Sequence, residues 1–156
     1  MKLESSQSAG GVIRVVGDLF GEDNLDRPLD TPLAAHDLIL HGIPAAALQH
    51  LIGRLEVLDK TEGLEKAVGM SLRTFQRRKD APSRPLSPEQ SGRAWVFAEI
   101  LARAMATFGS LSEAEHWLDR PALALDGRRP IDLLATPAGT ELVSDLIEQL
   151  DLGVYP

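Results

Sequence analysis

Three pairs of a hydroxyl residue and a proline constrain the fold of this chain more than any other feature of its sequence. They are residues 31–32, 87–88 and 136–137, and they read Thr-Pro, Ser-Pro and Thr-Pro. A Ser or Thr side chain caps the free N–H groups at a helix start, and proline fits the first helical position because its missing N–H has no partner there. Each pair therefore predicts that a helix begins at its proline.

The middle pair opens the longest helix that the sequence predicts. Gln90, three residues after Ser87, can complete a capping box, and Gly109 can end the helix. Apolar residues between them repeat with the i, i+3, i+4 spacing of one helix face: Ala94, Phe97, Ala98, Leu101, Ala104, Met105 and Phe108. We expect this stripe to lie in the core, with a dimer contact as the alternative for part of it.

Shorter helices are predicted on both sides. Gly42 can close the helix that begins at Pro32, and Pro44 can begin the next one. The predicted apolar faces are Ala47, Leu48, Leu51, Ile52 and Leu55 after Pro44; Ala114, Trp117 and Leu118 after Ser110; and Leu142, Val143, Leu146, Ile147 and Leu150 after Thr136.

Capping-box spacing marks two more helix starts, at Asp59 with Glu62 and at Ser110 with Glu113. Strand signals are nearly absent, because residues 12–16 (VIRVV) are the one β-rich stretch and a single strand cannot build a sheet. Residues 126–127 predict a turn, residues 130–134 a helical turn, and the Pro/Ser-rich residues 81–86 a linker. The sequence therefore predicts an all-α fold.

Positive charge is concentrated in one short segment. Residues 61–85 carry six basic and three acidic side chains, whereas residues 1–60 carry five and nine and residues 86–156 carry five and eleven. The whole chain has a net charge of −7, so its mean field repels phosphate and argues against indiscriminate binding to nucleic acid. A DNA site, if there is one, is expected within residues 61–85.

The same segment has the pattern of a helix-turn-helix, which needs a small residue where the chain reverses and apolar residues that lock the two helices. Gly69 fits the turn, and Ser71 can cap the second helix. Glu65 departs from the pattern, because a small residue is usual inside the helix pair. The residues predicted to face the core are Leu64, Val68, Met70, Leu72 and Phe75.

The second helix of this motif carries the residue types of a DNA-recognition helix. Arg reads guanine, Gln reads adenine, and Lys or Thr can hold phosphates. We rank Arg73, Gln76 and Arg77 as the base readers, and Arg78 has a structural ion pair as its alternative role. The candidate DNA-binding residues are Ser71, Arg73, Thr74, Gln76, Arg77, Arg78 and Lys79.

Four motifs follow one another along the chain: residues 71–78 (SLRTFQRR), 86–90 (LSPEQ), 127–134 (GRRPIDLL) and 153–156 (GVYP). With these motifs in this order, the chain resembles the Xre/MbcA/ParS-type antitoxins of bacterial type II toxin–antitoxin systems over about residues 40–156. The resemblance implies a RES-domain toxin that depletes NAD as partner, encoded by the adjacent gene, and repression of the shared operon. It also implies an Xre-like helix-turn-helix DNA-binding domain (31–84) and a helical toxin-binding domain with a C-terminal tail (85–156), after a variable N-terminal segment (1–30).

The resemblance further implies that the tail covers the NAD site of the toxin. Gly153 can end the last helix in a left-handed conformation, and Tyr155 can anchor in a pocket. Without the resemblance, a frayed terminus is the ordinary interpretation. Arg128 and Arg129 can either meet acidic toxin groups or cap helix carbonyls. The candidate toxin-binding residues are Arg128, Arg129, Gly153, Val154, Tyr155 and Pro156.

Other chemistry finds little support in the sequence. The absence of cysteine excludes disulfides, thiolate metal sites and cysteine nucleophiles. The four histidines (36, 41, 50 and 116) lack the pairing of a zinc motif, and neither a phosphate loop nor a Gly-x-Ser-x-Gly elbow occurs. We therefore expect no enzyme activity, cofactor or metal. Two alternatives stay open: a plain helix-turn-helix repressor whose C-terminal domain only dimerises or senses a ligand, and an antitoxin of a non-RES toxin.

The sequence also bears on partners and location. No apolar run approaches the roughly 20 residues that cross a bilayer, and residues 1–11 lack the apolar core of a secretory signal. We expect a cytoplasmic protein without a membrane partner. We also expect a homodimer in which residues 59–80 of each subunit read one half-site of operator DNA.

Overall fold

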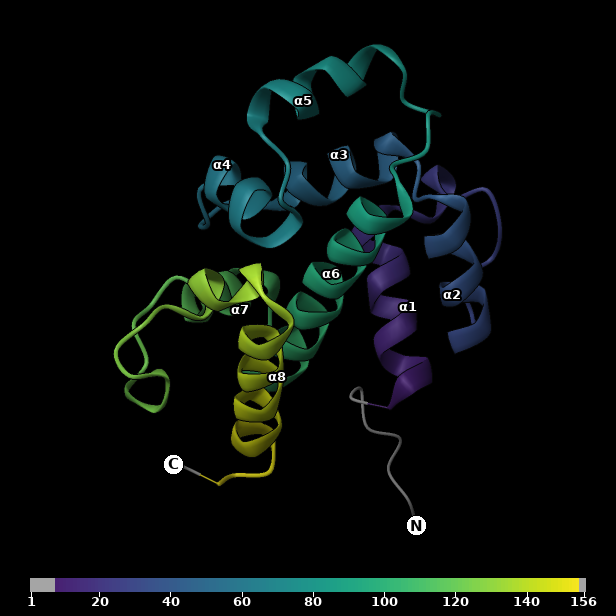
Figure 1. Ribbon diagram of the computed structural model, residues 1–156. Helices are drawn as coiled ribbons and strands as arrows, with labels where there is room; N and C mark the ends of the chain where they lie inside the picture. Colours follow the sequence, from purple (N-terminus) through teal and green to yellow (C-terminus); the bar gives the residue numbers. More distant parts are fainter. Residues whose placement is uncertain (1–7, 155–156) are drawn as a thin grey trace.

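The computed structural model describes residues 8–154, which form helices and contain no strand (Figure 1). Two isolated β-bridges join Pro44 to Pro85 and Ala122 to Arg128. The predicted all-α fold is confirmed. The label η denotes a 3-10 helix, except that η2 is a π-helix. The elements are α1 (Ala9–Phe20), η1 (Glu22–Asn24), α2 (Pro32–His41), α3 (Ala45–Arg54), α4 (Lys60–Glu62), η2 (Gly63–Val68), α5 (Leu72–Arg77), η3 (Arg78–Asp80), α6 (Pro88–Phe108), α7 (Leu111–Leu118), η4 (Leu123–Leu125), η5 (Pro130–Ala135) and α8 (Pro137–Asp151).

Helix α6 is the central element, and the others pack around it. It begins with the complete capping box predicted at Ser87 and Gln90 and ends at Gly109. At about 1.5 Å per residue its 21 residues span roughly 30 Å. Helices α1 and α2 contact it on one side, and α7 and α8 contact it on the other (Figure 1). Because it is covered from several directions, residues outside the predicted stripe, such as Trp95 and Ile100, are buried as well.

The β-rich stretch at residues 12–16 lies inside helix α1 and forms no strand. Ser8 caps this helix by accepting a hydrogen bond from the N–H of Gly11 at 3.1 Å. Val12, Val16 and Phe20 recur at every fourth position and are buried against α3 and α6. Burial at helical spacing thus outweighs the modest preference of β-branched residues for strands, which is weak and depends on context.

The remaining helix starts agree with the predicted caps. The hydroxyl groups of Thr31, Ser110 and Thr136 accept hydrogen bonds from backbone N–H groups three residues further on, at 3.0–3.1 Å. Gly42, with φ of 97°, ends α2 as predicted.

Two predicted core positions are wrong or only partly right. Leu142 is 55% exposed, since it lies about 100° around α8 from the buried Val143 and falls off the packed face. Trp117 is half-buried and packs against Phe108, with ring centroids 5.2 Å apart. The other predicted apolar residues of α3, α7 and α8 are buried or partly buried.

The buried side chains form one continuous apolar cluster that runs from α1 to α8. Helix α5 lies at one end of the molecule and the C-terminal end of α8 at the other (Figure 1). In the described range no single helix is long and apolar enough to cross a membrane; the sharply bent pair α6–α7 meets that test only when joined, by length and composition alone.

Candidate functional sites

The predicted helix-turn-helix is present and is formed by α4, η2 and α5. Asp59 starts it by accepting a hydrogen bond from the N–H of Glu62 at 3.0 Å. The chain reverses at Gly69, whose φ is 73°; a Cβ there would lie 2.1 Å from Nη1 of Arg93. Glycine fits because it adopts positive φ without strain and leaves room for the guanidinium. Glu65 is exposed, so the departure from the usual small residue costs no packing.

The core of this motif agrees with the prediction at four of five positions. Leu64, Val68, Met70 and Phe75 are buried. Leu72 is 36% exposed, because it is the first residue of α5 and follows the exposed Ser71 at the edge of the packed face. The last residues of the first helix form a π-helix, a feature with no local signal in the sequence.

The seven candidate DNA-binding residues lie on helix α5 and directly before and after it, in one short and largely solvent-exposed segment. Ser71 caps the helix by accepting from the N–H of Thr74 at 3.1 Å, as predicted. Arg73, Gln76 and Arg77 are exposed and share one face, since they lie three and four residues apart. The segment can therefore present two guanidinium groups and one amide to a ligand.

The two remaining cations of this segment have contacts within the chain. Arg78 is half-buried and donates to the carbonyl oxygen of Pro85 at 3.4 Å, so it contacts a backbone group and not the carboxylate considered as its alternative partner. The ammonium group of Lys79 lies 5.7 Å from the ring centroid of Phe75. Both contacts order the end of α5.

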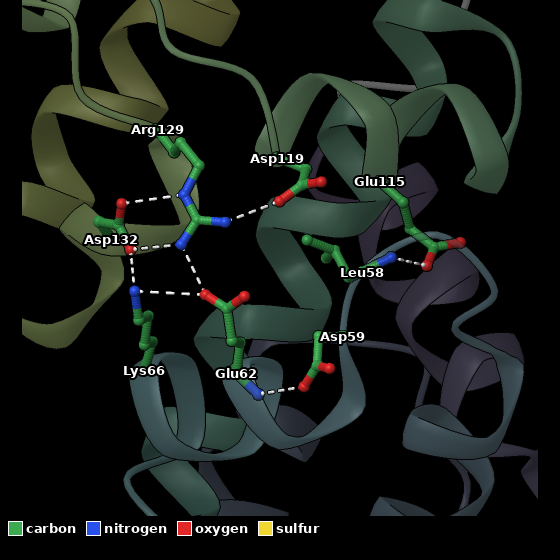
Figure 2. Close-up of polar contacts among 8 residues, drawn as sticks. All are labelled: Leu58, Asp59, Glu62, Lys66, Glu115, Asp119, Arg129 and Asp132. Atoms are coloured by element: carbon green, nitrogen blue, oxygen red, sulfur yellow. Dashed lines mark hydrogen bonds and ion pairs between the residues drawn. The ribbon is translucent and has the colours of Figure 1, made fainter.

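A second cluster joins the helix-turn-helix to the C-terminal part of the chain (Figure 2). The Arg129 guanidinium donates to the carboxylates of Glu62 at 2.5 Å, Asp119 at 2.8 Å, and Asp132 at 3.0 and 3.1 Å. Lys66 pairs with Asp132 and, at 3.3 Å, with Glu62. We call these five residues the ion-pair cluster. It connects the helix-turn-helix to the segment from the end of α7 to η5, and its residues in these two parts are more than 50 positions apart in the sequence.

The electrostatics of the ion-pair cluster follow from these contacts. The hydrogen bond from Arg129, then that from Lys66, lowers the pKa of Glu62. Arg129 and then Lys66 likewise lower the pKa of Asp132, although burial opposes the shift. Asp132 and then Glu62 raise the pKa of Lys66, again against burial. Each group is thereby held in its charged form.

A buried carboxylate makes a second link between the same two parts of the chain. Glu115 on α7 is 1% exposed, and its Oε1 accepts hydrogen bonds from the N–H groups of Glu56, Val57 and Leu58 at 2.9, 2.9 and 3.1 Å. Figure 2 shows the bond from Leu58. These three N–H groups belong to the turn that precedes the helix-turn-helix. Their bonds compensate the cost of burying the charge and fix the turn on α7.

The candidate toxin-binding residues lie at two separate places. Arg128 is exposed in the loop before η5, whereas Arg129 belongs to the ion-pair cluster, a third role beside the two considered from the sequence. Gly153, with φ of 77°, ends α8 as predicted: its N–H bonds to the carbonyl of Leu150, and the N–H of Val154 bonds to that of Gln149. This is the Schellman arrangement. Tyr155 and Pro156 lie outside the described residues.

The sequence did not single out Glu115, Lys66, Asp119 or Asp132 as important. Each looks like an ordinary charged residue of a helix or turn, and each finds its partners through the tertiary fold. Two signals were available: the motif at residues 127–134 contains Arg129 and Asp132, and Glu62, chosen as a capping-box residue, accepts from Arg129 and Lys66.

A groove of about 800 Å³ lies between α6, η5 and α8. Its apolar lining residues include Val96, Phe97 and Ile100, and its polar lining residues include Glu89, Arg93 and Glu141. Within residues 8–154, no group of three or more His, Asp or Glu side chains is arranged to hold a metal ion.

Both halves of the chain are similar to domains of known proteins. The antitoxin Xre-like helix-turn-helix domain matches residues 34–99, and the antitoxin Xre/MbcA/ParS C-terminal toxin-binding domain matches residues 103–153. The antitoxin Xre of Pseudomonas putida is 32% identical over 130 residues, which cover 80% of this chain and 79% of that protein. A protein of a Sphingobium species, named Prs ADP-ribosylating antitoxin, is 28% identical over 134 residues, with 80% and 82% covered.

Proposed function

Since the chain belongs to the Xre/MbcA/ParS-type antitoxins, with a helix-turn-helix domain followed by a toxin-binding domain, we propose that it neutralises a RES-domain toxin by covering the toxin's NAD site with its C-terminal tail. We further propose that it binds operator DNA through α5 and so regulates its own operon. The inhibition is steric, and the antitoxin supplies no catalytic group and no cofactor.

The observation that carries the first proposal is the end of α8. The helix stops in a Schellman arrangement at Gly153, and Val154 beyond it is 54% exposed. The final residues thus follow a well-defined helix end within the part of the chain that matches a toxin-binding domain. A rigid helix that ends in a short apolar segment can hold that segment in a cleft at low entropic cost.

The nature of the toxin rests on the resemblance in the four motifs. The name of the Sphingobium relative is compatible with it, because ADP-ribosylation uses NAD as its donor. A toxin that depletes NAD and one that transfers ADP-ribose must both bind NAD in a pocket, and a tail can close either pocket.

The experiment for this proposal uses cells that express the neighbouring gene. Intracellular NAD and growth are measured with no antitoxin, with the full chain, and with a chain that ends at Leu152. We expect the partner to drain NAD, the full chain to restore it and the shortened chain to fail. A partner that leaves NAD untouched contradicts the RES assignment, and a shortened chain that protects fully contradicts the role of the tail.

The DNA-binding proposal is supported by the exposed face of α5. Arg73, Gln76 and Arg77 lie together on it, inside the one segment of the chain with net positive charge. If Arg77 reads a base, Arg77→Ala should weaken operator binding by about 1–3 kcal/mol. Arg14→Ala is the matched control, since Arg14 is an exposed arginine on α1. Equal affinities of the two variants would remove Arg77 from the site.

The DNA-binding unit in this proposal is a homodimer, with residues 59–80 of each subunit on one half-site. The half-sites of the inverted repeat are expected about one helical turn or a multiple apart. Because the positive charge is local, affinity should fall steeply with salt. Footprinting of the region upstream of the operon at two salt concentrations measures the spacing of the half-sites and the salt dependence of the affinity. An asymmetric single site would contradict the dimer.

A further inference from the structure

The loop between α7 and η5 displays a leucine that the rest of the described chain does not cover. Leu123, in the short helix η4, is 98% exposed. Single exposed leucines are common on protein surfaces, so exposure by itself indicates no function. The contacts that hold this loop in place are what indicate a function for Leu123.

Backbone hydrogen bonds close the loop into a fixed turn. The N–H of Ala122 donates to the carbonyl of Arg128 at 3.0 Å, and the N–H of Gly127 donates to that of Ala122 at 2.9 Å. Leu125 is buried and anchors the turn on the core. Asp126 has φ of 60°, the only positive φ of a non-glycine residue within residues 8–154. An L-residue is strained in this conformation, so the rest of the fold compensates the conformational free energy that this turn costs.

The ion-pair cluster fixes the two ends of the same loop. Asp119 stands at its start and Arg129 at its end, and their side chains are joined at 2.8 Å (Figure 2). Leu123 is therefore held in one place before any partner arrives. A contact residue that is ordered in advance loses little conformational entropy on binding.

The loop also carries two cations, one before and one after Leu123 in the sequence. Arg120 and Arg128 are exposed, and neither forms an ion pair with a residue of the described range. They are two of the five basic residues in the acidic segment 86–156. A loop that carries an exposed apolar side chain and two unpaired cations is complementary to an apolar pocket bordered by carboxylates.

The position of the loop identifies its partner. It belongs to the part of the chain that matches a toxin-binding domain, and it lies, like the end of α8, away from α5 in Figure 1. We propose that residues 120–128 form a second contact with the toxin, in which Leu123 enters an apolar pocket and Arg120 and Arg128 pair with acidic residues at its border. This inference rests on the proposed function, because the toxin is the partner. The loop holds the complex together, while the tail blocks the NAD site.

The test measures binding of full-length variants to the toxin encoded by the neighbouring gene, freed from its complex in denaturant and refolded. Leu123→Asp should weaken binding by about tenfold or more, the loss expected when one leucine is no longer buried. Its unfolding midpoint should equal that of the unaltered chain, since the side chain is exposed. Leu33→Asp, at a 69% exposed leucine of α2, is the matched control and should bind as the unaltered chain does.

The outcomes separate this inference from the function on which it rests. If the unaltered chain does not bind the toxin, the proposed function fails and the loop contact with it. If the unaltered chain and Leu123→Asp bind equally well, only the loop contact is overturned. If Leu123→Asp instead changes the oligomeric state of the free antitoxin in light scattering, the leucine contacts a second copy of this chain, and the inference is again wrong.

Discussion

Replacing Arg129 with methionine removes the guanidinium at the centre of the ion-pair cluster while keeping an aliphatic stem to pack beside η5. The arginine bonds to three carboxylates at 2.5–3.1 Å, and its side chain is 25% exposed. Hydrogen bonds to charged groups contribute about 1.5–3 kcal/mol each. Their sum is not expected, because Glu62 and Asp119 are more than a third exposed and solvent screens them. We expect a net loss of about 2–3 kcal/mol.

Urea unfolding, followed by circular dichroism, measures this loss. With a slope of about 2 kcal/mol per molar urea, the midpoint should fall by about 1 M. Arg120→Met is the matched control, since it removes the same charge from an exposed position of the same loop, and its midpoint should change by less than about 0.3 M. Equal shifts in the two variants would refute the reasoning.

The pH dependence of the same variant tests the electrostatic part. Glu62 and Asp132 have lowered pKa values, so their stabilisation is complete above their ordinary values of 4.5 and 3.8 and is lost as the pH falls through the lower values of the folded state. The difference in unfolding free energy between the unaltered chain and Arg129→Met should therefore be constant from about pH 5 to 8 and shrink below about pH 4. A difference that persists unchanged to pH 3 would show that packing, and not charge, accounts for it.

Three further changes test other parts of the fold. Glu115→Ala leaves three backbone N–H groups without their acceptor and should lower the free energy of unfolding in urea by about 3–5 kcal/mol. Glu115→Gln keeps a carbonyl acceptor and should cost less than half as much. Equal costs would contradict the hydrogen-bonding role of Glu115. In Gly69→Ala the alanine must adopt a positive φ and displace Arg93 from the carbonyl of Lys66. We therefore expect a lower thermal midpoint and a free energy of unfolding that is lower by about 1–2 kcal/mol. An unchanged midpoint would contradict the tight turn. Ser87→Ala removes half of the capping box of α6 and should cost about 1 kcal/mol, measured against the unaltered chain by the same scan; no loss would mean that packing alone fixes the start of this helix.

The order and ends of the main helices could be predicted from the sequence because the signals are local. A cap at Ser87 or Thr136 and a glycine at position 42 or 109 act within four residues, and the structure has a helix end at each. The turn at Gly69 and the exposed face of α5 were predicted for the same reason. Local signals failed at residues 12–16, where contacts with α3 and α6 decide that a β-rich stretch is helical.

The links between the two domains could not be predicted, because their partners are far apart in sequence. Glu115 reaches N–H groups 57–59 residues away, and Arg129 reaches Glu62, 67 residues away. Spacing rules identify neighbours on one helix and say nothing about such pairs. The sequence also gave no sign that Leu123 is fully exposed, since it looks like any apolar residue before a turn.

NAD binding by purified complexes tests most directly whether the tail closes the NAD site of a toxin. The toxin is prepared in complex with the full chain and with the chain that ends at Leu152, and NAD affinity is measured by calorimetry together with the stability of each complex. We expect both complexes to form, and the complex with the full chain to bind NAD about 100-fold more weakly or worse. Equal NAD affinity in two intact complexes would contradict occlusion by the tail and place the inhibition elsewhere on the antitoxin.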